Sequence, residues 1–325
     1  MSRTLLPAGL RVSEVFGLSP LRERAAEALK ALRGDPNVPP TRFDHTSLQI
    51  FRPAMALPLW LGRPARGREV PIYNLFNYLQ PPPSEGWSVR VTRVRDFLGT
   101  ALTYDSHNGT DLAVPLGTVV VAGAAGVVRR VSREFDRGGL KVFLDHGAGL
   151  ITTSNHLARP LVSVGQRVAR GQPIALSGYS GLDGLSTFPW GAPHVHYNVW
   201  LNGAYVDPFA PVGTSPLWRT GNWPTPMPAG APDDEIPDDD WDPEAVEASR
   251  AACRDDGARA QIEAAPDLAT RAVTVLFHRL YYPNRFVSAP PLYRREAPRT
   301  PRLDLPFRAQ DFDGIVFPHG AKPPR

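Results

Sequence analysis

The stretch TVVVAGAAGVVRRVSREFDRGGLKVFLDHGAGLITTSN, residues 118–155, decides the fold class of this chain. It divides into short runs rich in Val, Leu, Ile and Thr, which the turn-forming sequences DRGG and DHGAG separate. Short β-branched runs interrupted by Asp and Gly are typical of strands joined by hairpin turns. The stretch therefore predicts an antiparallel β-sheet, and the run QPIALSG at 172–178 is expected to extend it.

This β pattern continues over residues 88–212, which we interpret as the core of a mainly β protein, either a twisted sheet or an open sandwich. Residues 1–87 are expected to form an N-terminal extension with one helix near 20–33, because Pro20 and Gly34 are typical of the two ends of a helix. The predicted apolar stripe of that helix consists of Leu21, Ala25, Leu29 and Leu32. The Pro-rich sequence LQPPPSEGW at 79–87 is the expected boundary.

The C-terminal third divides into two further regions. Residues 213–242 combine Pro with an acidic run, which favours a solvated, flexible linker. Residues 243–325 are predicted to be helical and then irregular. We expect a helix of about twenty residues from Asp242-Pro243 and a second helix in the sequence PDLATRAVTVLFHRLYY. The fold prediction is therefore a β-sheet core with helical and irregular extensions at both ends.

Composition limits the function classes. The 42% hydrophobic content supports a packed core, and the single cysteine, Cys253, excludes an internal disulfide. Residues 100–212 carry 8 Lys and Arg against 7 Asp and Glu, so the core is not a basic nucleic-acid binder. The most apolar run, AMALPLWLG at 54–62, is too short for a membrane span of about 20 residues. No secretory signal is visible in the first twenty residues, so we expect a soluble protein.

Two histidines lie one residue apart in the strand-like run GAPHVHYNVW, residues 191–200. Residues i and i+2 of a strand point to the same face, so His194 and His196 project together. Such a pair alone is more often structural, but the sequence SHNGTD adds His107 and Asp111, four residues apart. Together with one histidine of the pair, they make a His₂Asp set that suits a catalytic zinc with an open fourth position. The other histidine is then free to move protons.

A resemblance to a known family follows from four motifs in order. They are His-x-x-x-Asp at 107–111, Thr-x-x-x-His-Leu at 152–157, V-x-x-G-Q-x-V-x-x-G-Q-x-I at 162–174, and Pro-His-x-His at 193–196. This order resembles the lysostaphin/LytM-type zinc metalloendopeptidases, bacterial enzymes that cut peptide bonds in the cross-links of peptidoglycan, often at glycine. The resemblance covers about residues 100–212.

The resemblance implies a set of roles and partners. It implies one Zn²⁺ held by His107, Asp111 and His196, with His156 and His194 as the catalytic histidines. The implied substrate is peptidoglycan or a glycine-containing peptide, and the implied location is periplasmic or extracellular. No export signal is visible, so an unconventional secretion route, a different start codon and a cytoplasmic substrate all stay open.

Three positions depart from the family pattern. Ser154 stands where the family has a tyrosine, which predicts the loss of one oxyanion donor and a slow hydrolase. Asn198 replaces a glutamate that often follows the histidine pair, and the loop YSGLDGLSTFPWGAP at 179–193 is longer than usual. We expect these last two to alter substrate fit rather than chemistry.

The remaining histidines and aromatic residues have plainer explanations, and two alternative functions stay open. His146 is expected to be a turn or rim residue, and His45, His278 and His319 have no partners at ligand spacing. The aromatic residues Trp190, Tyr197 and Trp200 would line a cleft or pack in the core. One alternative function is a non-catalytic family member that binds the cell wall or activates amidases. A second, weaker one is a biotinyl or lipoyl carrier, because VGQRVARGQPIAL is similar to a carrier hairpin. It is poorly supported, since the one lysine of residues 88–212, Lys141, lies in a strand-like run and not in a tight turn.

Overall fold

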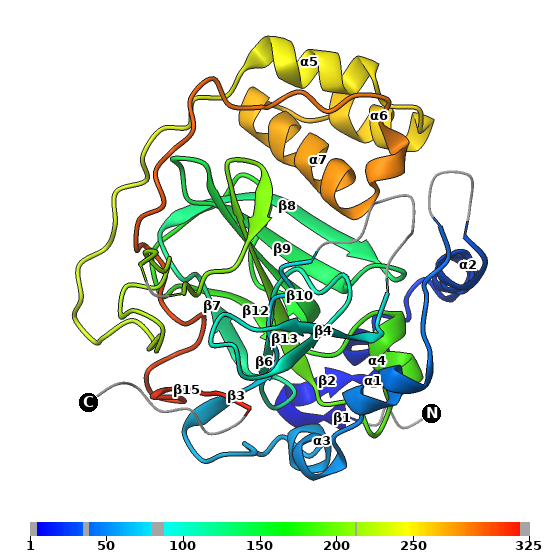
Figure 1. Cartoon of the computed structure of the whole chain (residues 1–325), viewed down its shortest axis with the longest axis vertical. Coiled ribbons are helices and arrows are strands. Elements are labelled where there is room, and N and C mark those ends of the chain that lie inside the picture. Colours follow the sequence, from blue (N-terminus) through cyan, green and yellow to red (C-terminus); the bar gives the residue numbers. More distant parts are fainter. Residues whose placement is uncertain (1–4, 35–38, 80–87, 212, 319–325) are drawn as a thin grey trace.

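A single large β-sheet organises the molecule (Figure 1), and the mainly β prediction is confirmed. The computed structural model describes residues 5–34, 39–79, 88–211 and 213–318. Within these described residues eleven strands belong to the sheet, and its main path runs β11-β8-β9-β10-β13-β6-β3-β15. Strand β12 pairs with β10 and β7, and β14 pairs with β13. All of these pairs are antiparallel except β15 with β3, which is parallel.

The strands of this sheet are, in chain order, β3 (Glu69–Asn74), β6 (Thr110–Ala113), β7 (Val119–Val121), β8 (Gly126–Glu134), β9 (Gly139–Asp145), β10 (Leu150–Pro160), β11 (Arg167–Val168), β12 (Pro173–Ser177), β13 (His194–Leu201), β14 (Ala204–Val206) and β15 (Gly314–Val316). Strands β3 and β15 lie outside the 88–212 core that the sequence pattern delimits. Segments from both ends of the chain therefore complete the sheet. Two small hairpins are separate: β1 (Leu5–Leu6) with β2 (Leu10–Arg11), and β4 (Val91–Arg95) with β5 (Leu102–Tyr104).

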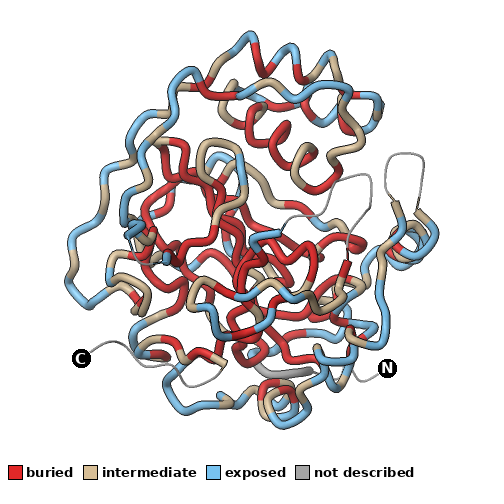
Figure 2. Tube along the Cα trace, viewed as in Figure 1, coloured by how far each residue is buried: buried red, intermediate tan, exposed pale blue. Residues whose placement is uncertain are grey.

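The two faces of the central strands have different surroundings. Directly opposed residues of paired strands share a face, so the register of β9, β10 and β13 sorts their side chains. Val142, Ser154 and Tyr197 form one such row, on the face that packs into the main hydrophobic core. Phe143, Thr153 and Asn198 form a row on the opposite face. Figure 2 shows the buried residues gathered in the strands at the centre of the molecule.

Three C-terminal helices cover part of this second face. They are α5 (Pro243–Ala251), α6 (Asp256–Glu263) and α7 (Leu268–Tyr281), and their core includes Phe143, Ile151 and Trp200 of the sheet. The expected second helix is confirmed as α7. The expected helix of about twenty residues is wrong, because α5 ends at Ala251 and Asp255 starts α6 by accepting a hydrogen bond from the Ala258 amide at 2.7 Å. Aspartate at this position favours a new helix start over continuation.

The N-terminal extension contains α1 (Val12–Val15), α2 (Leu21–Arg33), α3 (Pro53–Trp60) and the 3₁₀-helix η2 (His45–Ile50). The helix expected near 20–33 is α2, but its predicted stripe does not pack, since Leu21, Leu29 and Leu32 are exposed. The helix is held instead through Arg24, which bonds the Arg133 carbonyl, and through Glu27, which accepts from the Phe135 amide at 2.6 Å. The boundary predicted at 79–87 lies, apart from Leu79, outside the described residues.

The prediction that 213–242 is a solvated, flexible linker is wrong. Trp218 is fully buried and stacks on Tyr197, with ring centroids 5.7 Å apart. Asp239 accepts a hydrogen bond from the Gly149 amide at 2.7 Å. At Gly147, where φ is +71°, a Cβ would overlap the Pro237 carbonyl, so the segment needs a glycine there to approach this closely. Trp218 and Trp241 are buried. The large apolar area of such side chains keeps the segment packed on the protein, although its composition is typical of a connector.

In the described part of the chain, no helix combines the length and apolarity that a membrane crossing requires. Short α4 (Leu182–Thr187) is the one helix that the structure places within the described residues 88–211.

Candidate metal centre

Two adjacent antiparallel strands bring the first candidate residues together. Strand β6 pairs with β13 so that Asp111 lies directly opposite His196, and His194 lies opposite Ala113. His107 precedes β6 in a loop, where its Nδ1 donates to the Leu75 carbonyl at 2.7 Å. That bond leaves the lone pair on His107 Nε2, which faces Asp111. The cross-strand register and one backbone hydrogen bond thus aim three side chains at one point.

The carboxylate oxygen Oδ1 of Asp111 is the common point of these side chains. It lies 2.7 Å from His196 Nδ1, 3.1 Å from His107 Nε2 and 3.5 Å from His194 Nε2. One ligand atom from each of His107, Asp111 and His196 can be chosen so that all three lie within 4.8 Å of one another. This spacing is compatible with three ligands of one small cation.

Asp111 is fully buried, and a residue of the N-terminal extension bonds its second carboxylate oxygen. The side chain of Asn74, at the end of β3, donates to Asp111 Oδ2 at 2.6 Å. Burial alone would raise the pKa of the Asp111 carboxyl, but the neighbouring His107 and His194 hold that pKa well below its usual range. The side chain is therefore an anion at neutral pH, with one oxygen occupied by Asn74 and the other directed at the imidazoles.

The remaining two histidines present the same ring atom to this point. His194 Nδ1 donates to the Ala192 carbonyl and His156 Nδ1 to the Ser180 carbonyl, each at 2.8 Å. Both Nε2 atoms therefore carry the lone pair. The His156 ring lies 4.9 Å from the His194 ring and 6.1 Å from the His196 ring, centroid to centroid. All five predicted site residues thus converge.

A local irregularity in β10 places His156. The register of β10 against β9 shifts between Ser154 and Leu157, as in a β-bulge, and His156 has φ of +60°. A bulge changes which face the following side chain takes. A non-glycine residue at positive φ is strained and is found most often at functional sites. Burial, with the nearby His194 and His196, lowers the pKa of His156 well below its usual range, so the ring is neutral.

The environment of His107 fits a metal ligand. Its Nε2 is buried and has no hydrogen-bond partner among the described residues, and an unpaired buried acceptor is costly unless something binds it. Burial likewise lowers the pKa of His196, which favours the neutral imidazole that metals require. A set of two histidines and one aspartate suits a catalytic zinc site, which uses three protein ligands and keeps the fourth position open.

Three tyrosines at the site escaped the sequence analysis. The ring of Tyr104, on β5, lies 4.4 Å from that of His107, and its hydroxyl is 3.5 Å from Asp111 Oδ2. Tyr179 lies 5.0 Å and Tyr73 5.4 Å from the His194 ring. Tyr104 is three residues before His107 in the sequence, which was a usable signal. Tyr73 comes from a strand far outside the motif region, and only the fold brings it here.

Two departures from the family pattern have consequences that differ from the expected ones. Ser154 shares a sheet face with Tyr197, on the hydrophobic-core side, so a side chain at this position faces away from His194 and His196. The register therefore argues against the expected loss of an oxyanion donor at Ser154, because a side chain there does not face the site. Asn198, in contrast, lies 2.9 Å from His196 Nε2 through its Nδ2. Its replacement of glutamate therefore concerns a direct contact with His196, not only substrate fit as expected.

Several other candidates are structural. His146 lies in the predicted turn but is fully buried, bonded to the Ala125 carbonyl and to Thr152 Oγ1, so the rim position is wrong. Tyr197 and Trp200 pack in the hydrophobic clusters, whereas Trp190 is half exposed. His278 is buried beside Arg285, and His319 lies outside the described residues. Lys141 is fully buried 2.8 Å from Glu134, so a carrier function that needs an exposed lysine is excluded.

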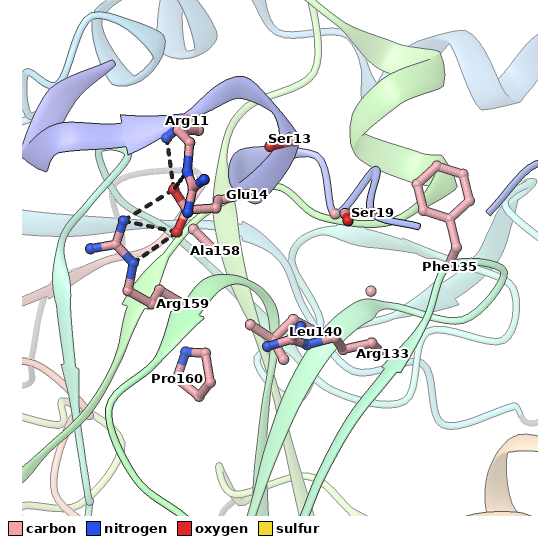
Figure 3. Close-up of a pocket in the computed structure, with 12 residues that line it drawn as sticks. Arg11, Ser13, Glu14, Ser19, Arg133, Phe135, Leu140, Ala158, Arg159 and Pro160 are labelled. Atoms are coloured by element: carbon pink, nitrogen blue, oxygen red, sulfur yellow. Dashed lines mark hydrogen bonds and ion pairs between the residues drawn. The ribbon is translucent and has the colours of Figure 1, made fainter. Parts of the chain in front are cut away.

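A separate pocket of about 330 Å³ lies between the N-terminal segment and β10 (Figure 3). Its lining includes Arg11, Glu14 and Arg159. The Glu14 carboxylate bonds both of these arginines, with Arg159 Nε at 2.9 Å. None of the five candidate site residues lines this pocket, and its charges largely satisfy one another. The chemistry therefore belongs to the histidine cluster.

Comparison with known proteins agrees with this geometry. Residues 105–208 match Peptidase family M23. A Haemophilus influenzae protein named "Uncharacterized metalloprotease" is 41% identical over 102 residues, which are 31% of this chain and 20% of that protein. Peptidoglycan DD-endopeptidase ShyA of Vibrio cholerae is 40% identical over 102 residues, 31% of this chain and 22% of the other. The chain thus spans only about a fifth of the length of these curated relatives.

Among solved structures, the catalytic domain of lysostaphin from Staphylococcus simulans is 29% identical, covering 31% of this chain and 75% of that one with a TM-score of 0.27. A peptidase family M23 protein from Pseudomonas aeruginosa is 42% identical, covering 31% and 41% with a TM-score of 0.28. The resemblance expected from the sequence motifs is confirmed by the family match, which contains all five candidate positions. Residues 105–208 of this chain therefore form a peptidase family M23 domain.

Proposed function

We propose that this protein is a zinc-dependent endopeptidase that hydrolyses peptide bonds in peptidoglycan cross-links. The observation that carries the proposal is the convergence of His107 Nε2, Asp111 Oδ1 and His196 Nδ1, with the Nε2 atoms of His194 and His156 beside them. The substrate class is supported by relatives named peptidoglycan DD-endopeptidases, which share the M23 region. A periplasmic or extracellular location follows from that substrate and is part of the same proposal.

In this proposal His107, Asp111 and His196 hold the zinc. Two neutral imidazoles and one carboxylate leave a fourth position open, as in other catalytic zinc sites. When bound, zinc supplies Lewis acidity toward water and toward the scissile carbonyl. Asn74 keeps the Asp111 carboxylate turned to the site by its 2.6 Å hydrogen bond, and the Leu75 carbonyl fixes the His107 tautomer.

The two other histidines, His194 and His156, have different roles toward the attacking water. His194 Nε2 carries a lone pair because Nδ1 donates to Ala192, so it accepts the proton of the attacking water and passes it to the leaving amine. His156 is neutral and presents an acceptor rather than a donor. It therefore orients the attacking water, and it is poorly suited to stabilise an oxyanion by donating a proton.

The oxyanion donor in this proposal is the Tyr104 hydroxyl. Burial, with the nearby Asp111 charge, raises the pKa of Tyr104 well above its usual value, so the hydroxyl keeps its proton. Tyr73 and Tyr179 are also close, but the Tyr73 hydroxyl donates to the Ile50 carbonyl and the Tyr179 hydroxyl accepts from Thr187 Oγ1. We choose Tyr104 because its hydroxyl lies beside the proposed ligand Asp111, 3.5 Å from Oδ2. A non-catalytic regulator is less well supported, because such a protein is expected to lack one of the five positions, and all five are present and converge.

The experiment that tests the proposal combines metal analysis with hydrolysis. The purified protein is expected to contain about one zinc per chain, to release peptides from purified peptidoglycan or to cleave a pentaglycine peptide, and to lose activity with dipicolinate until zinc is restored. Zinc-loaded protein that cleaves neither substrate would contradict the enzyme assignment. Protein that binds no zinc even after reconstitution would contradict the metal site itself.

A further inference from the structure

A buried cluster of amides joins the metal site to the C-terminal helices. Its centre is Asn198, which is fully buried on β13. The Asn198 Oδ1 atom accepts from Thr153 Oγ1 and Asn155 Nδ2, each at 2.9 Å, and from the Tyr281 hydroxyl at 3.1 Å. Three donors around one oxygen fix the orientation of the amide. The NH₂ end of Asn198 must then point the other way, toward the metal site.

The other end of the cluster reaches the metal ligand. Asn198 Nδ2 donates to the backbone carbonyl of Asn108 at 2.9 Å and to Asn108 Oδ1 at 2.8 Å. Asn108 Oδ1 lies 3.2 Å from His196 Nε2. Asn198 therefore clamps the Asn108 side chain at the position where its carbonyl oxygen faces the ring of His196.

The direction of these bonds matches what metal binding needs. In this structure His196 Nδ1 donates to Asp111 Oδ1 at 2.7 Å, and its Nε2 faces the Asn198 amide. When Nδ1 instead binds zinc, the proton of the neutral ring lies on Nε2 and needs an acceptor. Asn198 presents a donor at 2.9 Å and cannot accept it. Asn108 Oδ1 can accept it. Partners of this kind orient metal-bound histidines and set their basicity.

Tyr281, at the far end of this hydrogen-bond network, is held firmly by its neighbours. It is the last residue of α7 and is 5% exposed, and its ring lies 5.2 Å from Phe277. The Lys141 Nζ atom lies 5.3 Å from the ring centroid on the same face of the sheet. Tyr281 lies far outside residues 105–208, so this contact is supplied by a region that the family match does not include.

We propose that Asn198 and Tyr281 are positioning residues for the metal ligand His196, so that helix α7 forms part of the metal centre. The inference rests on the proposed function for the assignment of His196 as a ligand. It assigns the C-terminal helices a direct role in metal affinity. With asparagine at position 198, the acceptor for the His196 ring is Asn108 Oδ1.

The test measures zinc affinity on the full chain by competition with a chromogenic chelator, together with the visible spectrum of the Co²⁺-substituted protein. Tyr281→Phe removes only the hydroxyl and is expected to weaken zinc binding about fivefold, the effect of one net hydrogen bond. Asn198→Ala removes the clamp and is expected to weaken it about 10–100-fold, as for other outer-shell partners. Both variants are expected to change the Co²⁺ spectrum.

A double-mutant cycle and a matched control separate positioning from stability. If Tyr281 acts through Asn198, Tyr281→Phe has no further effect on zinc affinity in the Asn198→Ala background. The control is Tyr293→Phe, which removes a buried hydroxyl from the same helical cluster, where it has no hydrogen-bond partner among the described residues. This control is expected to leave zinc affinity and the Co²⁺ spectrum unchanged.

The outcomes distinguish this inference from the proposed function. Wild-type affinity in Asn198→Ala, or additive effects in the cycle, would overturn the positioning role while leaving the zinc site in place. A Tyr281→Phe protein that melts at a lower temperature but keeps wild-type zinc affinity would show that the hydroxyl is only structural. Wild-type protein that binds no zinc would overturn the proposed function and this inference together.

Discussion

His194 and His196 lie one residue apart on the same strand face, yet the structure predicts opposite outcomes when each is removed. His196 Nδ1 is 2.7 Å from Asp111 Oδ1, whereas His194 Nε2 is 3.5 Å from it and has its other nitrogen bonded to the Ala192 carbonyl. We therefore expect His196→Ala to lose zinc and activity together. We expect His194→Ala to keep its zinc and to lose turnover.

The size of each effect follows from the role. A positioned general acid-base contributes about 10²–10⁴-fold to the rate, so kcat of His194→Ala should fall by that factor, with about one zinc per chain retained. Removing His196 leaves two of the three proposed ligands, and Asn108 Oδ1 loses its contact with the His196 ring. Zinc content should then fall toward zero at the zinc concentration that saturates the wild type.

The assay measures zinc content after dialysis, kcat and KM on one peptide substrate, and thermal unfolding for each variant. His146→Gln is the matched control, because it removes a fully buried histidine that bonds Ala125 and Thr152 and lies outside the site. This control should keep both zinc and kcat. If His194→Ala empties the site while His196→Ala stays loaded, the two roles are exchanged and the reasoning from the Asp111 distances is refuted.

Three further predictions follow from the same structure. Tyr104→Phe should lower kcat by about 10²–10³-fold with zinc content and KM unchanged, because it removes the proposed oxyanion donor; a kcat within a factor of two of the wild type would rule that donor out. Ser154→Tyr should not raise kcat. It should reduce the free energy of unfolding by about 1–3 kcal/mol, since the larger side chain enters a packed core face. Chemical denaturation measures this loss, and a faster, equally stable variant would contradict the register argument. Burial lowers the pKa of His146 from 6.5 to about 4, so between these pH values the unfolded chain binds a proton that the folded chain does not. The free energy of unfolding should therefore fall by up to about 3 kcal/mol as the pH drops from 6.5 to 4. His146→Gln should flatten this part of the stability profile, and identical slopes for the two proteins would show that another group is responsible.

The strands could be predicted from the sequence because several local signals agree there. Runs such as LKVFLDHG and GLITTSN combine β-branched residues with Gly-containing turns, and they became β9 and β10. The helix periodicity of residues 21–33 was also correct, although its apolar stripe is exposed. Polar contacts of Arg24 and Glu27 dock that helix, and periodicity carries no information about such contacts.

The linker prediction failed for a different reason. The composition of residues 213–242 is that of a solvated connector, but Trp218 finds a fitting position against Tyr197 in the main core. Whether a tryptophan is buried depends on the surface it meets. That surface is formed by strands more than ten residues earlier in the chain, so the segment's own composition could not reveal it.

The sequence by itself predicted the five residues that we propose carry the chemistry. The shared face of His194 and His196 follows from the period of a strand, and the choice of His107 and Asp111 follows from the ligand preferences of zinc, both of which are local properties. Only the tertiary structure decided how these residues are supported. Asn74 and Tyr281 reach the site through cross-strand pairing and helix packing. Side chains brought together by long-range contacts leave no periodic trace in the sequence, because their separation along the chain is set by the fold.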